Sequence, residues 1–369
     1  MADVTPGEVA ARARGLVLID VREDEEYRAG HIGSAIHIPL GLLTDRIGAA
    51  VADPSTEIVL YCATGARSGI GAVFLTGAGY ANVSNMVGGF ENWKAEDLPW
   101  TAPPGLTPEQ AERYSRHLNL PDVGVAGQMK LLESRILIVG AGGLGSPVAL
   151  YLAAAGVGTI GIVDHDNVDD SNLQRQILHS VESVGGSKTE SARLRILGLN
   201  PDVKVEAHDV KLGSSNVLSI LAGYDLVVDA TDNFPTRYLI NDASLHLRIP
   251  VVHGSIYRFE GQVAVFNPYT GPCYRCLFEL PPPPDLAPSC ELGGVLGVLP
   301  GVIGTLQATE ALKLVLGIGQ PLSGALLLYD ALEQDFTRLS VARRTDCAAC
   351  SDPAHPPTLV DYDEACVPA

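Results

Sequence analysis

Hydrophobic residues in this chain come in short runs separated by polar turns, and the longest run lies at residues 136–163. It contains no charged residue, so a hydropathy window alone would suggest a membrane span. Its seven glycines and one proline instead divide it into a strand, a turn, a helix and a second strand. We expect Ser146 to cap the helix, Pro147 to occupy its first position and Gly156 to end it. The pattern predicts a βαβ unit and no membrane-spanning segment.

The turn of this unit has the composition of a nucleotide-binding loop. Glycine lacks a Cβ atom, which allows tight turning and lets backbone N–H groups approach a phosphate. Asp164 follows the second strand, where a carboxylate can accept hydrogen bonds from ribose hydroxyls. Dinucleotide-dependent oxidoreductases share this arrangement, so it predicts a bound nucleotide without saying which. The glycines concerned are Gly140, Gly142, Gly143 and Gly145.

Two shorter apolar runs, residues 15–20 and 57–61, each precede a polar turn and helical sequence, and they predict a separate small α/β unit. The second run is followed by Cys62-Ala-Thr-Gly-Ala-Arg67. Backbone N–H groups at a helix N-terminus and a neighbouring arginine both lower the pKa of a thiol. We therefore expect Cys62 to be reactive, with Arg67 beside it. An inert cysteine at a strand end is the alternative.

Two further motifs, Asp20-Val-Arg22-Glu23 and Gly30-His31-Ile32, precede the Cys62 loop. With these motifs and the loop, the first hundred residues resemble the rhodanese (sulfurtransferase) family over about residues 4–100. The resemblance implies that Cys62 carries a persulfide. Cysteine-dependent phosphatases resemble this arrangement too, but they have one more residue between cysteine and arginine, because phosphate is larger than one sulfur. Arg22 and His31 are expected to be structural.

Length, charge and cysteine content restrict the possible partners. A chain of 369 residues with 46% hydrophobic content predicts two or three globular domains. A net charge of −18 argues against a nucleic-acid or anionic-membrane partner, because both require a basic surface. Residues 1–15 contain no apolar signal core, which predicts a cytoplasmic protein. The seven cysteines are then thiols, metal ligands or catalysts rather than a disulfide framework.

A later set of polar residues separates two kinds of nucleotide chemistry. Hydride transfer leaves the pyrophosphate of a dinucleotide intact and needs few cations there. Cleavage at the α-phosphate of ATP calls for Mg²⁺ held by a carboxylate and for Arg or Lys side chains that stabilise the developing charge. Arg175, Lys188 and Asp232 supply these groups, the last one after a predicted strand at 225–229. The sequence therefore favours ATP cleavage.

Several motifs follow one another in a fixed order between about residue 113 and residue 350. They are Arg113-Tyr-Ser-Arg116, Gly140-Ala-Gly-Gly-Leu-Gly-Ser, Asp164, Ser171-Asn-Leu-Gln-Arg175-Gln, Lys188 and Asp229-Ala-Thr-Asp232-Asn. On these motifs the region resembles the adenylyltransferases that activate ubiquitin-like sulfur carriers, within the ubiquitin-activating-enzyme superfamily. The molybdopterin-synthase and thiamine-pathway branch is the most similar.

This resemblance implies roles for single residues. Residues 108–120 predict a helix with Arg113 and Arg116 on the same side. By resemblance Arg116 reaches the phosphates of the partner subunit, which implies a homodimer. The remaining implied roles are ribose binding by Asp164, phosphate binding by Asn172, Arg175 and Lys188, and positioning of Mg²⁺ by Asp232.

Two Cys-x-x-Cys pairs, Cys273/Cys276 and Cys347/Cys350, supply four thiolates, enough for a closed tetrahedral Zn²⁺ site. The pairs lie far apart for a small zinc ribbon. The resemblance, which includes such a structural zinc, therefore supports the site more strongly than the spacing does. A redox dithiol is the alternative.

Cys290 lies between these pairs in a segment so rich in Pro and Gly that we expect a loop over the site, followed by a helix at 302–316. By resemblance, this cysteine can bond transiently to the carrier or to sulfur. A loop thiol without function is the alternative, because no neighbouring base or cation marks it.

The predicted fold class is α/β throughout, a small rhodanese-like domain followed by a larger Rossmann-like nucleotide-binding domain with a mixed sheet. The proline content of residues 97–108 indicates a linker, and the acidic C-terminal segment indicates disorder. The predicted boundaries are 4–100 for the rhodanese-like domain, 101–108 for the linker, 109–351 for the adenylyltransferase domain and 352–369 for the disordered tail.

Together these features predict ATP-dependent adenylation of the C-terminal glycine of a ubiquitin-like sulfur carrier. Sulfur from the Cys62 persulfide, loaded by a donor such as a cysteine desulfurase, would then give the carrier thiocarboxylate. The order of domains is unusual, because we expect such fusions to carry the rhodanese at the C-terminal end. The alternatives are a dinucleotide-dependent oxidoreductase fused to a sulfurtransferase, and a non-catalytic scaffold that binds a carrier.

Overall fold

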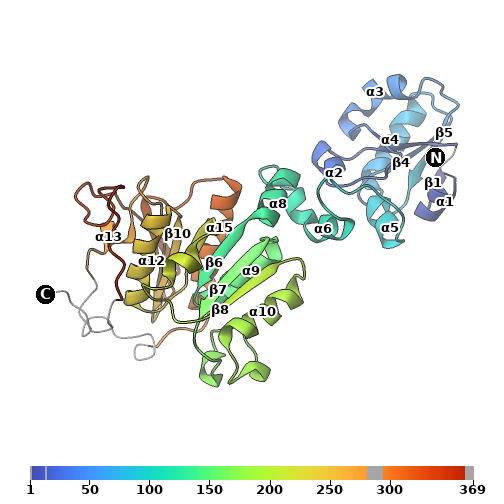
Figure 1. The fold of residues 1–369 in the computed structure, drawn as a ribbon. Helices are drawn as coiled ribbons and strands as arrows, with labels where there is room; N and C mark the ends of the chain where they lie inside the picture. Colours follow the sequence, from blue (N-terminus) through green and yellow to red (C-terminus); the bar gives the residue numbers. More distant parts are fainter. Residues whose placement is uncertain (1, 13–14, 281–293, 362–369) are drawn as a thin grey trace. The chain divides into compact units, whose positions relative to one another are not determined.

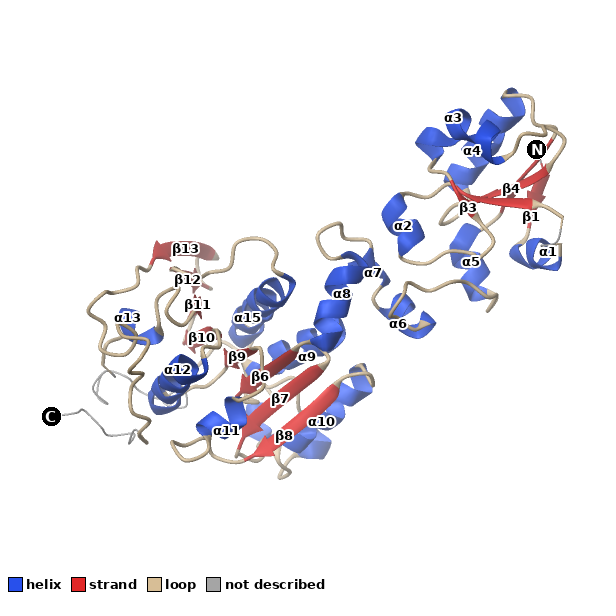
Figure 2. Ribbon diagram, turned by 45° about the horizontal axis from the view of Figure 1, so that its top comes forward, coloured by secondary structure: helices blue, strands red, loops and turns tan. Residues whose placement is uncertain are grey.

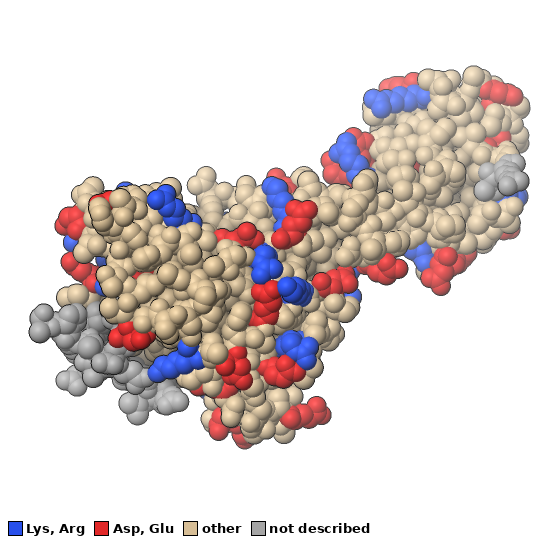
Figure 3. Space-filling model, in the orientation of Figure 1, with Lys and Arg blue, Asp and Glu red and all other residues tan. Residues whose placement is uncertain are grey.

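The computed structural model describes residues 2–12, 15–280 and 294–361 (Figure 1). The chain divides into two compact units, residues 1–129 and 130–369, so residues 101–129 are grouped with the first unit. Among the described residues, no helix is both long enough and apolar enough to cross a bilayer. On the face drawn in Figure 3, acidic and basic side chains are interspersed.

The first unit is built on a five-stranded parallel sheet with the order β1-β5-β4-β2-β3. Its strands are β1 (Ala2–Val4), β2 (Val17–Asp20), β3 (Ile36–His37), β4 (Glu57–Tyr61) and β5 (Asn82–Met86). Its helices include α1 (Pro6–Ala11), α2 (Asp24–Arg28), α3 (Leu43–Ala50), α4 (Ala66–Gly77) and α5 (Gly89–Ala95), with a 3₁₀ turn at Leu40–Leu42.

Successive residues of β4 point to opposite faces of this sheet, because side chains alternate along a strand. Ile58 and Leu60 pack into a core shared with α3 and α4. Val59 and Tyr61 pack into a second core shared with α1 and α5. The predicted small α/β unit is confirmed, with its central strands buried on both faces.

Residues 108–120 form two short helices instead of the single predicted helix. These are α6 (Pro108–Arg113) and α7 (Ser115–Leu118). Tyr114 breaks the run with φ −96° and ψ 10° and is only 2% exposed, so the break coincides with a buried ring. The argument that placed Arg113 and Arg116 on one side of a continuous helix is therefore wrong. The third helix of this region is α8 (Gly124–Glu133).

The second unit contains an eight-stranded mixed sheet with the order β13-β12-β11-β10-β9-β6-β7-β8. The strands from β8 to β10 run parallel, while β11, β12 and β13 join antiparallel, which confirms the predicted mixed sheet. Their bounds are β6 (Arg135–Val139), β7 (Thr159–Asp164), β8 (Lys204–Asp209), β9 (Leu226–Asp229), β10 (Val251–Tyr257), β11 (Glu260–Phe266), β12 (Ala325–Asp330) and β13 (Asp335–Ser340).

Helices cover both faces of this sheet (Figure 2). One face packs against α9 (Gly145–Ala155), α10 (Lys188–Leu199) and α15 (Leu299–Leu316). The other packs against α11 (Val217–Leu221), α12 (Phe234–Leu247) and α13 (Tyr274–Leu277). Two 3₁₀ turns, Asp170–Asn172 and Val181–Ser183, lie between β7 and α10. The carboxyl ends of β6, β7 and β9 meet at one edge of the sheet, where ligands bind in folds of this kind.

The predicted βαβ unit forms, with one difference at the start of its helix. Gly156 ends α9 in a left-handed conformation with φ +85°, as predicted. Ser146, however, lies inside the first turn of α9, and its hydroxyl donates to Gly142 O at 2.7 Å. Ser146 does not cap the helix and Pro147 does not occupy its first position, because the helix already begins at Gly145.

The acidic segment after the second cysteine pair is ordered where the structure describes it. His246 Nε2 lies 2.7 Å from Pro357 O, and Leu359 packs against the core on the α12 face. Ser214 donates to the Asp361 carboxylate through both its N–H and its hydroxyl. Composition alone suggested disorder, because these partners are single distant residues that leave no periodic pattern. Residues 362–369, with Cys366, lie outside the described residues.

Gly161, in the middle of β7, allows a close approach that a larger residue would prevent. A Cβ atom there would lie 2.3 Å from Tyr224 Oη and 2.7 Å from Leu137 Cδ1. We expect Gly161→Ala to destabilise the second unit by about 1–3 kcal/mol, because the buried ring has to move. Far-UV circular dichroism during urea unfolding measures the loss.

Gly198→Ala in α10 is the matched control, since a Cβ atom there meets nothing within 4 Å and alanine favours a helix. Both tryptophans, Trp93 and Trp100, lie in the first unit, so the unfolding midpoint by tryptophan fluorescence should stay unchanged in Gly161→Ala. Equal midpoints by circular dichroism for the two glycine variants would contradict the packing argument.

Candidate functional site

Cys62 lies directly after β4, in the loop that leads into α4. Gly65 N–H donates to its Sγ at 3.1 Å. Gly89 packs closely against the start of this loop, because a Cβ atom on it would lie 2.3 Å from Cys62 O. The residue as a whole is only 1% exposed. The strand end and the loop therefore hold the sulfur in a fixed place.

The pKa of the Cys62 thiol is lowered. Burial opposes the shift, but hydrogen bonds from the Ser68 hydroxyl and from backbone N–H groups of the loop outweigh it. Ser68 Oγ lies 2.7 Å from Asn85 Oδ1 and 3.5 Å from Cys62 Sγ. The Ser68 hydroxyl has one proton to donate, and Asn85 Oδ1 is the closer acceptor. We therefore attribute the stability of the Cys62 thiolate chiefly to the backbone N–H groups.

Arg67 interacts with Cys62, as expected, and has a second partner that was not expected. Its guanidinium makes a bidentate ion pair with Glu26, with both N–O distances at 2.7 Å. This pair raises the pKa of Arg67, and the interaction of Arg67 with Cys62 raises it further. The sequence did not suggest Glu26, which lies 41 residues earlier.

Arg22 and His31 have structural partners, as predicted. Arg22 is buried and pairs with Asp20 at 2.6 Å, and it also donates to Gly30 O at 2.7 Å. His31 Nδ1 lies 3.1 Å from Tyr27 O, and the two rings stack.

In the second unit, the glycine loop joins β6 to α9 with very little space. Gly140 has φ +100°, a conformation that side chains disfavour. A Cβ atom on Gly145 would lie 1.9 Å from Gly140 O. Gly145 therefore lets the helix start close to the strand, and it does not line the cavity itself.

A cavity of about 940 Å³ opens over this loop at the carboxyl ends of the parallel strands. That volume suits a nucleotide with part of a second substrate. The structure thus gathers residues that are scattered over nearly a hundred positions of the sequence. The predicted residues that line it are Gly140, Gly142, Gly143, Asp164, Asn172, Arg175, Lys188 and Asp232.

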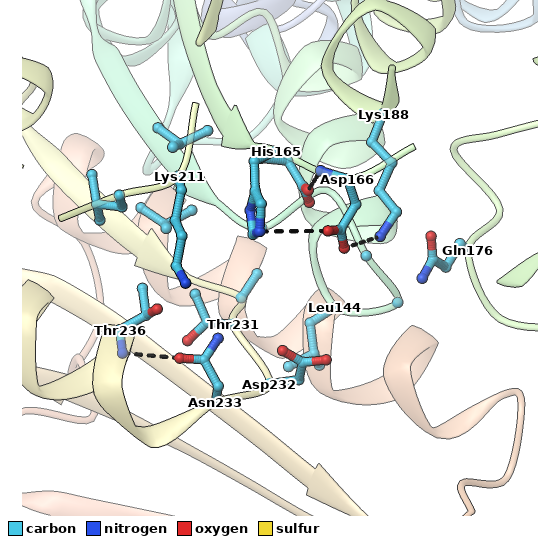
Figure 4. A pocket seen from close by; sticks show the side chains of 18 of the residues that line it. Leu144, His165, Asp166, Gln176, Lys188, Lys211, Thr231, Asp232, Asn233 and Thr236 are labelled. Atoms are coloured by element: carbon cyan, nitrogen blue, oxygen red, sulfur yellow. Dashed lines mark hydrogen bonds and ion pairs between the residues drawn. The ribbon is translucent and has the colours of Figure 1, made fainter. Parts of the chain in front are cut away.

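The charged groups of the cavity are held by one another and by the backbone. Asp164 accepts from Ala141 N–H at 2.7 Å and from Asp166 N–H at 2.9 Å. Lys188 Nζ pairs with Asp166 at 2.8 Å, as Figure 4 shows. Burial alone would raise the pKa of Asp166, but Lys188 and His165 lower it, so the pair is ionised at neutral pH.

Asp232 follows a turn that is fixed by buried polar groups. The Asp229 carboxylate accepts from Thr231 Oγ1 at 2.6 Å and from His253 Nδ1 at 2.7 Å. Gln307 Nε2 donates to Asp229 O at 2.7 Å. Burial disfavours the Asp229 charge, but His253, the nearby Arg237 and the hydrogen bond from Thr231 lower its pKa. Burial lowers the pKa of His253, so a neutral imidazole faces a carboxylate.

The cavity also contains residues to which the sequence assigned no role. Lys211 and Lys188 lie on opposite sides of it, with His165 and Asp166 between them (Figure 4). Gln176 is 5% exposed, and its Oε1 has no hydrogen-bond partner among the described residues. Lys211 lies just after β8, the strand next to the one that ends in Asp164. This position could have indicated a place in the site, but no sequence motif marks Lys211.

The four cysteines of the two Cys-x-x-Cys pairs meet in one buried cluster. Sγ–Sγ distances are 3.8 Å for Cys273–Cys276, 3.7 Å for Cys273–Cys347 and 3.5 Å for Cys276–Cys350. Tetrahedral zinc with Zn–S bonds of about 2.3 Å requires about 3.8 Å between sulfurs. Burial and the other thiols raise the pKa of Cys273, so a cation is needed to keep all four ionised. The cluster fits zinc.

The structure does not test the roles predicted for Cys290 and Arg116. Cys290 lies outside the described residues. Arg116 belongs to α7 in the first unit, and the role predicted for it concerns a partner subunit. Both roles stay predictions.

Comparison with protein families matches residues 114–349 to the ThiF family and residues 5–96 to the rhodanese-like domain. The sulfur carrier protein adenylyltransferase of Thermus thermophilus is 55% identical over 70% of this chain and 98% of its own. The probable adenylyltransferase/sulfurtransferase MoeZ of Mycobacterium tuberculosis is 50% identical over 71% of this chain. This chain covers only 66% of MoeZ.

Among solved structures, Escherichia coli MccB with AMPCPP and MccA has the same fold. It matches with a TM-score of 0.59 and 22% identity over 67% of this chain and 76% of its own. The family matches cover both units separately, and the glycine loop, Arg175, Lys188 and Asp232 all lie within the larger matched region. The chain belongs to the ThiF family of MoeB/ThiF-like adenylyltransferases and carries a rhodanese-like domain at its N-terminal end.

Proposed function

We propose that this chain adenylates the C-terminal glycine of a ubiquitin-like sulfur-carrier protein with ATP and then replaces the AMP by sulfur. The observation that carries the proposal is the single cavity in which the glycine loop, Arg175, Lys188 and Asp232 converge. The names of the relatives, a sulfur carrier adenylyltransferase and an adenylyltransferase/sulfurtransferase, agree with it.

In the first step a carrier carboxylate oxygen attacks the α-phosphorus of ATP, and the bond to pyrophosphate breaks. Backbone N–H groups of the glycine loop bind the phosphates, and Arg175 and Lys188 offset the negative charge that develops. Asp166 keeps the Lys188 ammonium directed into the cavity. The Asp232 side chain makes no hydrogen bond or ion pair with other described residues, so its carboxylate is available to hold Mg²⁺, which would neutralise phosphate charge.

In the second step the outer sulfur of the Cys62 persulfide attacks the acyl-adenylate carbonyl, AMP leaves, and an acyl disulfide forms. A thiol must then reduce it, so that the carrier keeps the transferred sulfur as a thiocarboxylate and Cys62 forms a disulfide with that thiol. Cys290 is our candidate. The lowered pKa of Cys62 suits this chemistry, because the loop stabilises an anionic sulfur.

The remaining parts of the proposal concern partners and organisation. A persulfide donor such as a cysteine desulfurase would load Cys62. A homodimer would let Arg116 reach the phosphates of the partner subunit. We retain domain boundaries at 4–100 and 109–351, and we propose that the four-cysteine cluster binds one Zn²⁺ of purely structural role.

The division of labour predicts that Cys62→Ala separates the two reactions. The variant should keep carrier-dependent exchange of pyrophosphate into ATP at the level of the unmodified protein, because that step does not use sulfur. It should form no thiocarboxylate, as measured by intact mass of candidate carriers with ATP, Mg²⁺ and a sulfur donor. Cys366→Ala is the control and should retain both reactions. If no carrier exchanges an oxygen for sulfur with the unmodified protein, the proposed function is wrong.

The metal role of Asp232 predicts that Asp232→Ala reduces pyrophosphate exchange by at least about 100-fold, since loss of charge stabilisation costs several kcal/mol at the transition state. Asp170→Ala removes an exposed carboxylate outside the cavity and should exchange normally. Normal exchange by Asp232→Ala would remove this residue from the metal site.

The cysteine cluster predicts one Zn²⁺ per chain by elemental analysis and loss of that metal in Cys347→Ser. Because buried thiols then lack their cation, the second unit should unfold at a lower temperature. The tryptophan fluorescence of the first unit reports whether the loss is local. A zinc-free protein of unchanged stability would contradict the structural role.

A further inference from the structure

The segment that follows the second cysteine pair reaches the nucleotide cavity. It leaves the cluster at Cys350, contacts His246 through Pro357 O and buries Leu359 against the core. Its last described residue, Asp361, lines the cavity. A part of the chain without any recognised motif thus joins the site.

Asp361 holds the loop that follows β8. Ser214 N–H donates to Asp361 Oδ1 at 2.6 Å, and Ser214 Oγ donates to Oδ2 at 2.9 Å. These bonds, with the charge of Lys211, lower the pKa of Asp361, so it is an anion at neutral pH. A Cβ atom on Gly213 would lie 3.1 Å from Asp361 Oδ1, which shows how closely the carboxylate follows the backbone.

The loop that Asp361 holds forms one end of the cavity, and we place the nucleotide base at this end. With phosphates over the glycine loop and ribose at Asp164, the base continues toward the neighbouring strand. That strand is β8, since Asp164 pairs with Asp209 across the sheet. Val210, Lys211 and Leu212, which follow directly, line the cavity there.

We propose that Asp361 is a positioning residue of the nucleotide site, which fixes Ser214 and thereby the 210–213 wall against which the base of ATP packs. The inference rests on the proposed function for the identity of the nucleotide. It makes the segment after the zinc cluster a component of the binding site, and it predicts an effect on binding of the base rather than on the chemistry.

The test measures dissociation constants for ATP by calorimetry. Asp361→Ala and a chain that ends at Ser351 should each bind ATP about 10-fold more weakly, the effect of losing charge-assisted hydrogen bonds. Asp361→Asn should lie between them and the unmodified protein, because its amide oxygen still accepts from Ser214 N–H. A chain that ends at Asp361 and the variant Asp352→Ala, in the same segment, should bind within about 2-fold of the unmodified protein.

Inorganic tripolyphosphate separates positioning from general damage. It reaches the phosphate groups but not the base wall, so the variants should bind it like the unmodified protein. In pyrophosphate exchange KM for ATP should rise while kcat stays within about 2-fold. Equal ATP affinity in Asp361→Ala overturns the inference, and so does an equal loss of tripolyphosphate binding. If the unmodified protein binds no ATP, the proposed function itself fails.

Discussion

The close approach of Gly145 to Gly140 O is the contact on which the second unit depends. Because no Cβ atom stands between them, α9 starts directly at the end of β6, and Gly140, Gly142 and Gly143 line the cavity. The same start places the apolar side of α9 against α10 and α15 over the sheet. A larger residue at either position would move the helix, the core behind it and the phosphate-binding groups together.

The opposite wall of the cavity depends on buried charge. Asp229 is 2% exposed, yet Thr231, His253 and Gln307 satisfy its carboxylate and carbonyl oxygens. A buried carboxylate is tolerated only when hydrogen-bonded in this way. The arrangement costs free energy compared with an apolar core, and it holds rigid the turn that carries Asp232.

Local patterns in the sequence were sufficient for the strands β2, β4, β6, β7 and β9, the end of α9 at Gly156, the Cys62 loop and most of the residues that converge on the cavity. They failed where a distant side chain decides the outcome. Glu26 as partner of Arg67, Tyr114 as the break between α6 and α7, and Asp361 against Ser214 all depend on contacts between residues far apart or on burial. The start of α9 was predicted two positions too late, since the helix begins at Gly145, the glycine that permits close packing.

The ion pair between Arg67 and Glu26 has a consequence for anion selectivity. A free arginine beside a ring of N–H groups would attract anions in proportion to their charge. With Glu26 2.7 Å from its guanidinium, the pair is close to neutral at long range, whereas the Gly65 N–H group still points at the sulfur. The loop therefore holds an anionic sulfur by directed hydrogen bonds more than by a net positive charge.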